Sequence, residues 1–294
     1  MKRPKQINLP ERLVEAARHR RLIPFIGAGL SRQADPARYP GWTELLLRMA
    51  DKFVDEGFLS EVERPSLESM LRVGNNPQAV AETIKSRVPR DAYYSFLQDQ
   101  FSHIPARPSS AHIQVFRLNP PLIVTTNYDQ LIENAYAYSV KQALSVVSYD
   151  QPAQVRNKLL NALFLKTPFL FKLHGDIDNP SEIILTGSDY ERLKQRHDGY
   201  KLLLSSLFFH YTTLFIGFSL SDVEIMLHIR NVQEALAGER YPDYALFSET
   251  SCTDREAAEF RRQFGIQVLR YKTDGLRHSG LPSFLIRLAD QLLN

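Results

Sequence analysis

Short apolar runs recur along the chain and alternate with segments of helical periodicity. Each run is four or five residues long, and the runs lie at residues 22–26, 122–126, 169–173, 213–216, 244–247 and 266–269. Runs that are apolar throughout are typical of strands buried on both faces of a parallel sheet. The helical segments lie at residues 11–20, 129–138, 221–236, 253–263 and 281–293. This alternation predicts an α/β fold with an open, mostly parallel, Rossmann-like sheet and helices on both faces.

Residues 41–118 break the alternation because their pattern is helical throughout. One of the expected helices has a clear start, since Asn76 can cap its first turn and Pro77 suits the first helical position. We therefore predict a helical module inserted between the first and second strands of a single domain that spans residues 1–294.

Three other segments depart from the simple alternation. Residues 148–168 are expected to form a small irregular insert, and residues 181–185 a short antiparallel excursion. Residues 202–221 carry no formal charge over a length that could cross a bilayer, but they include hydroxyl side chains, a histidine and a glycine. They also change halfway from helix-forming to strand-forming residues. This change predicts a buried helix followed by a buried strand, and no membrane span.

The composition excludes several classes of protein. An apolar share of 44% is enough for a packed core, and the single cysteine, Cys252, can form neither an intramolecular disulfide nor a four-cysteine zinc site. We therefore expect a reducing, cytoplasmic setting and no zinc. The formal charge of +3 does not by itself indicate a nucleic-acid partner, for which the basic runs at residues 2–5 and 19–21 are the local support.

A glycine-rich turn follows the first apolar run. Gly27 and Gly29 allow a tight turn in which backbone N–H groups approach a pyrophosphate, and Ala28 and Ser31 belong to the same turn. Ligands of open α/β sheets bind at the carboxyl ends of the strands, where this turn is expected. The third glycine of the full dinucleotide fingerprint is absent, so a strand-to-helix turn that binds no ligand is the alternative.

Polar side chains also follow the next two apolar runs. Thr126, Asn127 and Asp129 can line a ribose pocket, and the alternative is that Asn127 or Asp129 caps the helix that follows. His174 and Gly175 come after the run at residues 169–173. A lone histidine often has a structural role, but a histidine at the end of a strand is well placed to act as a general base.

The fourth motif repeats the succession of strand, glycine and hydroxyl group. Gly217 ends the strand region, and Ser221 or Asp222 is expected to cap the next helix, which leaves Ser219 free to face a cofactor. Each motif alone is a modest signal. Because all four fall at predicted strand ends along one rim of one sheet, together they predict a ligand site.

In this order, the motifs GAGLS, TTNYD, KLHGD and GFSLSD resemble those of the sirtuin-type NAD-binding fold. The longer stretches IVTTNYDQLIE, FKLHGDI and LFIGFSLSDVEI are more closely similar to its bacterial branch, found in anti-phage defence systems. The resemblance covers roughly residues 22–293 and is least specific in the helical module.

The resemblance implies a role for each motif. It places the NAD pyrophosphate at Gly27, Ala28, Gly29 and Ser31. It places the nicotinamide ribose beside Asn127 and Asp129, the catalytic base at His174, and the adenosine side at Gly217 and Ser219.

The sequence departs from sirtuin deacylases in two ways. It cannot build their four-cysteine zinc ribbon, and after the glycine-rich turn it carries YPGW where they have a proline–aspartate–phenylalanine–arginine stretch. Arg32, Asp35 or Arg38 could supply a cofactor contact in that loop, but none of them aligns with it. The defence branch shares both departures and is similar in hydrolysing NAD. The resemblance therefore implies a zinc-free NAD glycohydrolase that uses NAD as its substrate and forms nicotinamide and ADP-ribose.

Other functions stay open at this point. The chain could be a catalytically silent subunit that binds NAD or ADP-ribose, a nucleic-acid-processing subunit of a defence complex, or a protein deacylase, which the missing ribbon disfavours.

The resemblance also implies a homo-oligomeric ring and a separately encoded partner, such as a hexameric helicase-type ATPase or a prokaryotic Argonaute. The helical module and the last helix are the expected contact surfaces, and no sensor domain is recognised in the sequence.

Overall fold

The computed structural model describes residues 9–74, 76–101, 107–196, 198–237, 239, 241–273 and 278–292. Within these residues seven strands form one sheet in the order β3-β4-β2-β1-β5-β6-β7, and every neighbouring pair is parallel. The strands are β1 (Leu22–Ile26), β2 (Leu122–Thr125), β3 (Ser145–Ser148), β4 (Phe169–Lys172), β5 (Thr212–Ile216), β6 (Asp243–Ser248) and β7 (Ile266–Tyr271). The predicted open, parallel α/β sheet is confirmed.

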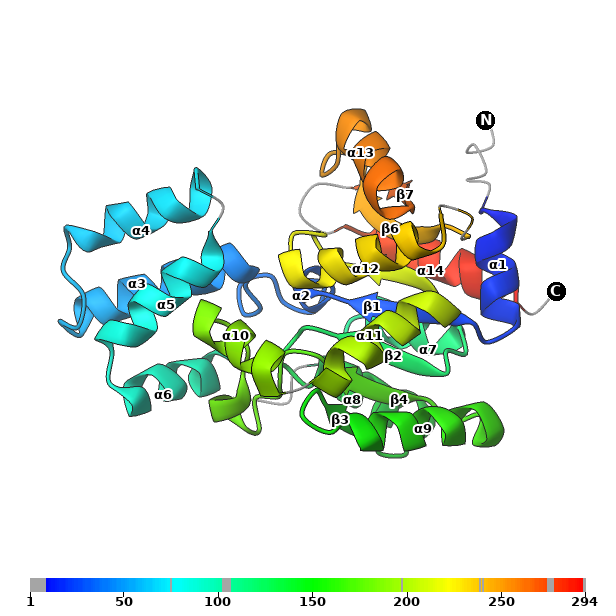
Figure 1. Cartoon of the computed structure of the whole chain (residues 1–294), viewed down its shortest axis with the longest axis horizontal. Helices are drawn as coiled ribbons and strands as arrows, with labels where there is room; N and C mark the ends of the chain where they lie inside the picture. Colours follow the sequence, from blue (N-terminus) through cyan, green and yellow to red (C-terminus); the bar gives the residue numbers. More distant parts are fainter. Residues whose placement is uncertain are drawn as a thin grey trace.

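Helices cover both faces of this sheet (Figure 1), as predicted. One face packs on α9 (Pro152–Leu165), α10 (Gly187–Arg196), α11 (Asp198–His210), α12 (Val223–Ala235) and α13 (Asp254–Phe264). The other face packs on α1 (Glu11–Arg18), α2 (Ala28–Ser31), α7 (Ser110–Arg117), α8 (Leu131–Val140) and α14 (Gly280–Asp290). Each set of helices forms a separate apolar core with the strands, because every central strand is buried on both sides.

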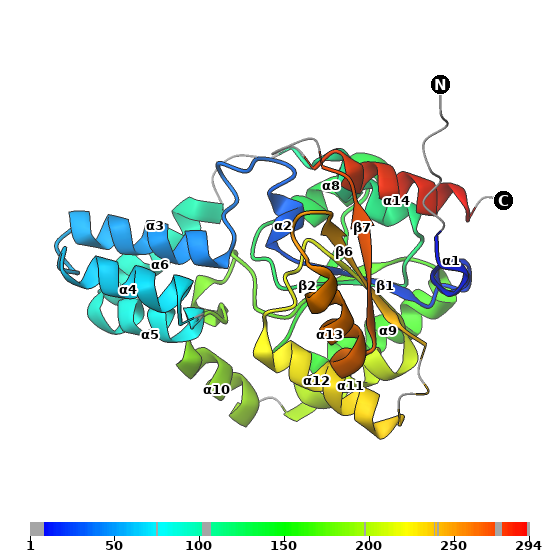
Figure 2. The same cartoon turned by 90° about the horizontal axis from the view of Figure 1, so that it is seen from above.

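Four helices form a separate cluster beside the sheet, shown in cyan and blue in Figure 2. This four-helix cluster consists of α3 (Trp42–Asp55), α4 (Glu63–Arg72), α5 (Pro77–Arg87) and α6 (Arg90–Phe101). The predicted start of α5 is confirmed, because the Asn76 side chain accepts a hydrogen bond from the N–H of Ala79 at 3.1 Å. The last helix of the segment 41–118, α7, instead packs on α8 and α14 against the sheet.

Two predictions between β2 and β5 are wrong. Residues 148–168 are mostly regular, because α9 occupies most of them and β3 ends at their first residue. The strand β3 lies at the edge of the sheet and buries Val147 but not its neighbours, so it lacks a fully apolar sequence. Residues 181–185 form no antiparallel pair. A short 3₁₀ helix, η1 (Pro180–Glu182), begins this segment instead, and a proline cannot donate to a strand ladder.

The uncharged stretch at residues 202–221 contains the end of α11 followed by β5, so the predicted succession of helix and strand is confirmed, but the helix is only partly buried. The helix is amphipathic, since α11 buries Leu204 and Leu207 while Leu202 is 72% exposed. None of the helices in the described ranges is both long and apolar enough to cross a membrane.

Of the two basic runs, the one at residues 2–5 lies outside the described residues. In the run at residues 19–21, the Arg20 guanidinium donates to the Asn119 side chain at 2.5 Å and to the carbonyl oxygen of Lys166 at 3.4 Å. Arg20 therefore has contacts within the fold.

Candidate active site

The chain switches direction across the sheet at β1, because β2 lies on one side of β1 and β5 on the other. In open α/β sheets, ligands bind in the crevice at the carboxyl ends of such strands. A cavity of about 810 Å³ lies at this point. The loops after the strands form one part of its wall, and the four-helix cluster contributes Trp42, Leu45 and Phe101 to another. A cavity of this size is within the usual range for ligand sites.

The glycine-rich turn after β1 packs directly on the turn after β5. The N–H of Gly29 donates to the carbonyl oxygen of Gly217 at 2.8 Å. A Cβ on Gly27 or Gly29 would lie only 2.6 or 2.8 Å from the backbone of Gly217, so this approach requires glycine at both positions. Ala28, Gly29 and Gly217 line the cavity, whereas Gly27 contributes through this packing.

Ser31 joins the first motif to the second. Its hydroxyl donates to Asp129 Oδ2 at 2.7 Å and accepts a hydrogen bond from Asn127 Nδ2 at 2.9 Å. Asp129 is 6% exposed, and burial raises the pKa of its carboxyl group against the opposing hydrogen bond from Ser31. The other carboxylate oxygen of Asp129 accepts from the N–H of Leu131 at 3.0 Å. Asp129 therefore both faces the cavity and supports the start of α8.

His174 follows β4 and lines the same cavity, although it is only 5% exposed. Its Nε2 lies 3.5 Å from Asp222 Oδ2 and 3.5 Å from the Tyr190 hydroxyl. Burial lowers the pKa of His174, and the nearby Asp222 charge partly opposes this shift. The imidazole is therefore neutral near pH 7 and able to accept a proton.

Backbone geometry after β4 and β5 sets the position of these groups. Gly175 has φ +88°, and a Cβ there would lie 2.6 Å from the carbonyl oxygen of Glu182. The prediction that Asp222 caps α12 is confirmed, because its Oδ1 accepts from the N–H groups of Glu224 and Ile225. Asp222 thus has two roles, since its other oxygen faces His174.

The remaining candidate residues occupy different places. Thr126 and Ser219 line the cavity, and the Ser219 hydroxyl is exposed and lies 2.6 Å from that of Ser221. Arg32 also lines it and forms an ion pair of 2.6 Å with Glu44 of α3. Asp35 and Arg38 are not among the described residues that line the cavity; the Asp35 carboxylate instead accepts from two backbone N–H groups of its own loop.

Two residues that support the site were not identified from the sequence. Lys172 is fully buried, and its ammonium lies 2.8 Å from both the Glu133 and the Asp176 carboxylates and 2.9 Å from the carbonyl oxygen of Asp129. Burial opposes its charge, but the two carboxylates outweigh this effect and raise the pKa of Lys172. A lysine ending the apolar run FLFK was the available signal. Tyr190 lies in a helix without a motif, so no signal marked it.

The strand order and the cavity at its switch point define a doubly wound α/β protein of the Rossmann type. The chain belongs to the SIR2-like domain family, whose model it matches over residues 121–269.

Three relatives illustrate this membership. The chain is 24% identical over 261 residues to Defense-associated sirtuin 2 of Bacillus subtilis, covering 87% of this chain and 24% of that protein. It is 27% identical over 244 residues to the NAD(+) hydrolase ThsA of Bacillus cereus, covering 83% and 46% of the two chains. It is 27% identical over 241 residues to the ThsA of Enterococcus faecium, covering 81% and 45%. The chain spans less than half the length of these relatives, and the resemblance to sirtuin-like defence proteins is confirmed.

Proposed function

We propose that this chain hydrolyses NAD at the bond between nicotinamide and ribose, and that it acts in anti-phage defence by depleting NAD. The observation that carries this proposal is the meeting of Asn127, Asp129 and His174 in one cavity at the switch point of the sheet. The similarity to two proteins named NAD(+) hydrolase and to a defence-associated sirtuin supports it.

The proposed reaction needs a base but no general acid. The bond between the ribose carbon and the nicotinamide nitrogen breaks, and the electron pair neutralises the pyridinium as nicotinamide leaves. Positive charge then develops on the ribose, as in other glycosyl transfers. A water molecule attacks this carbon and passes its proton to neutral His174, which leaves ADP-ribose. Asn127 orients the ribose or the water, and Asp129 holds the turn and stabilises the developing charge.

Removal of the base tests this proposal. We expect His174→Ala to release nicotinamide about 10²–10⁴ times more slowly than the parent, the usual effect of losing a positioned base. Asn127→Ala should also be strongly impaired, because its amide no longer orients the substrate. The exposed His210 is a matched control, since it lies at the end of α11 and outside the cavity lining. Circular dichroism would show that the variants fold. Parent-like NAD consumption by both site variants would disprove the assignment.

We also propose the wider setting that the resemblance implies. In this setting the chain is cytoplasmic, forms a homo-oligomeric ring and is controlled by a separately encoded partner, such as a helicase-type ATPase or an Argonaute. Nicotinamide release with and without the genomic neighbour would test this control. Tight NAD binding without release, even with the partner and phage DNA present, would instead indicate a silent binding subunit. DNA binding with a steep salt dependence would indicate a nucleic-acid subunit.

A further inference from the structure

The contacts of His174 continue through Tyr190 into the four-helix cluster. We infer that Tyr190 and Asp222 position the imidazole of His174, and that α5 holds α10 where Tyr190 can do so. The effect on catalysis rests on the proposed function, whereas the geometry does not.

The Tyr190 hydroxyl and the Asp222 carboxylate contact each other beside the imidazole of His174. The Tyr190 hydroxyl donates to Asp222 Oδ2 at 2.7 Å, and both oxygens lie 3.5 Å from His174 Nε2. The rings of Tyr190 and His174 pack edge to face, with centroids 5.4 Å apart. Because two backbone N–H groups at the start of α12 hold the other Asp222 oxygen, the carboxylate cannot swing away from this position. Tyr190 and Asp222 are each 3% exposed, so water does not replace these contacts readily.

Other charged groups near this arrangement are paired. Lys194 of α10 forms an ion pair of 3.1 Å with Glu224 of α12, so it links the helix of Tyr190 to the helix that Asp222 caps. Asp129, which also lines the cavity, is hydrogen-bonded to Ser31. The Asp222 charge is therefore the one that acts most directly on the imidazole.

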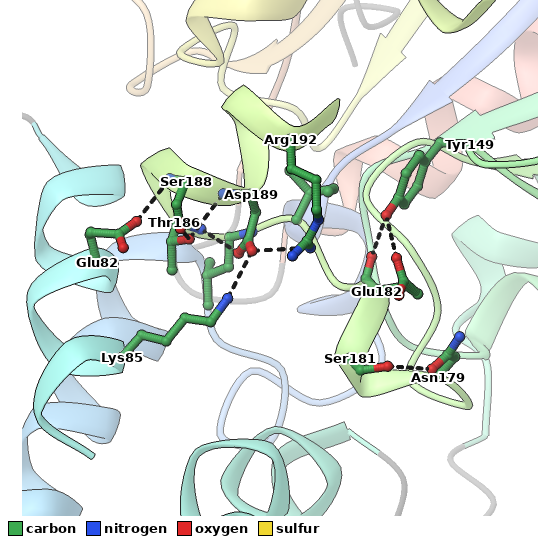
Figure 3. A network of polar contacts seen from close by, with 12 residues as sticks. Glu82, Lys85, Tyr149, Asn179, Ser181, Glu182, Thr186, Ser188, Asp189 and Arg192 are labelled. Carbon is green, nitrogen blue, oxygen red and sulfur yellow. Dashed lines mark hydrogen bonds and ion pairs between the residues drawn. The ribbon is translucent and has the colours of Figure 1, made fainter. Parts of the chain in front are cut away.

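Polar contacts attach α10, which carries Tyr190, to α5 of the four-helix cluster (Figure 3). Asp189, next to Tyr190 in the chain, is almost fully buried and accepts from the Lys85 ammonium at 2.8 Å. Arg192 lies 3.1 Å from the same oxygen. The Glu82 carboxylate accepts from the N–H of Ser188 at 2.8 Å, so α5 contacts the first turn of α10 at two points. A shift of α5 relative to the sheet would move Asp189, and Tyr190 with it.

Two substitutions test the positioning of His174 by Tyr190 and Asp222, and they are expected to shift the pKa of His174 in opposite directions. In Tyr190→Phe the Asp222 oxygen loses its donor, so it should interact more strongly with protonated His174 and raise the pKa of the imidazole. In Asp222→Asn the negative charge disappears, so the pKa of His174 should fall further. Asparagine caps helices as well as aspartate does, so the start of α12 is retained. The titration is followed by NMR of histidine labelled with ¹³C, with the His174 signal assigned from the spectrum of His174→Gln.

A second tyrosine provides the control. Tyr200 is also buried, and its hydroxyl has no hydrogen-bond partner among the described residues, so Tyr200→Phe should leave the titration of His174 unchanged. In the NAD assay, Tyr190→Phe should lower kcat by up to about 10²-fold, the effect of a small misplacement of a reacting group, and leave KM unchanged. Tyr200→Phe should keep the parent kcat.

A substitution within the four-helix cluster tests the attachment of α10 to α5. Lys85→Met keeps most of the length of the side chain but removes its charge from Asp189, so it should shift the His174 titration in the direction of Tyr190→Phe and lower kcat. Lys52→Met breaks an exposed ion pair between Lys52 of α3 and Glu56 at the end of the same helix, and it should have no effect. A shift with Lys52→Met equal to that with Lys85→Met would contradict the attachment.

The two proposals fail in different ways. If the parent releases no nicotinamide, the proposed function is wrong, yet opposite titration shifts in Tyr190→Phe and Asp222→Asn would still support the positioning. If both variants titrate as the parent does, or shift in the same direction, the positioning is wrong whatever the activity.

Discussion

At the scale of single residues, the site depends on glycines that let two backbone turns touch. Gly217 has φ +64°, and a Cβ at this position would lie 2.2 Å from the backbone nitrogen of Leu30. Gly57 has a similar φ of +76°, but nothing lies within 4 Å of the place where its Cβ would be. Substitutions at these two glycines therefore distinguish the cost of the left-handed backbone conformation, which both share, from the cost of steric contact, which only Gly217 has.

We predict that Gly217→Ala destabilises the protein more than Gly57→Ala does. Both variants place a Cβ in the left-handed region, which costs roughly 1–2 kcal/mol. Gly217→Ala also forces the turns after β1 and β5 apart, which adds about 1–3 kcal/mol of overpacking. Urea unfolding at pH 7 would measure both free energies, and NAD binding should be lost only in Gly217→Ala. Equal stabilities would show that the turns can separate freely.

At the scale of elements, the sequence predicts what depends on local pattern. The strands β1, β2, β4 and β5 are buried on both faces and therefore mostly apolar, so their runs are easy to recognise. The polar motifs converge because parallel strands end at the same edge of the sheet. The edge strand β3 is half exposed, and its short sequence SVVS carries neither a fully apolar run nor a long alternation.

Contacts between distant elements have no such local pattern. The hydrogen bonds of Ser31 to Asn127 and Asp129 join motifs that are 96 and 98 residues apart. The sequence predicts that these motifs are neighbours, but not which atoms meet. Tyr190 approaches His174 only because α10 packs between the sheet and α5, and no periodicity records that placement.

Lys172 is the clearest tie between elements, since it joins β4 to α8 and to the loop after β4. We predict that Lys172→Met lowers the free energy of unfolding by about 3–5 kcal/mol, because it leaves the Glu133 and Asp176 carboxylates without their buried cation. The double variant Lys172→Met/Glu133→Gln should recover part of this loss. Urea unfolding measures both, and Lys52→Met, in an exposed ion pair, is the control. A double variant no more stable than the single one would contradict this account.

At the scale of the whole molecule, the chain leaves the sheet after β1, builds the four-helix cluster and returns through α7. The cavity lies between the two parts, so its shape depends on both. The helix α7 is the element that brings the chain back, and it packs on α14 from the far end of the sequence. His112 belongs to α7 and is 1% exposed.

The stability of the whole molecule should therefore depend on pH through His112. Burial lowers the pKa of His112 to about 3 from its ordinary value of 6.5. Above pH 6.5 the group is neutral in both the folded and the unfolded chain and has no effect. Below that value the unfolded chain binds a proton that the folded chain cannot, so the free energy of unfolding should fall by about 1.4 kcal/mol per pH unit. This loss continues until the pH approaches 3.

A single substitution can isolate this contribution. His112 Nδ1 accepts from the N–H of Ser109 at 3.2 Å in a capping box at the start of α7, and glutamine at the same position can complete such a box without titrating. We predict that His112→Gln loses this share of the pH dependence between pH 6.5 and 4.5, as measured by urea unfolding. The buried His174 contributes to both curves equally, so the difference between them reports His112 alone. Parallel curves would mean that α7 opens far enough for His112 to be protonated while the sheet stays folded.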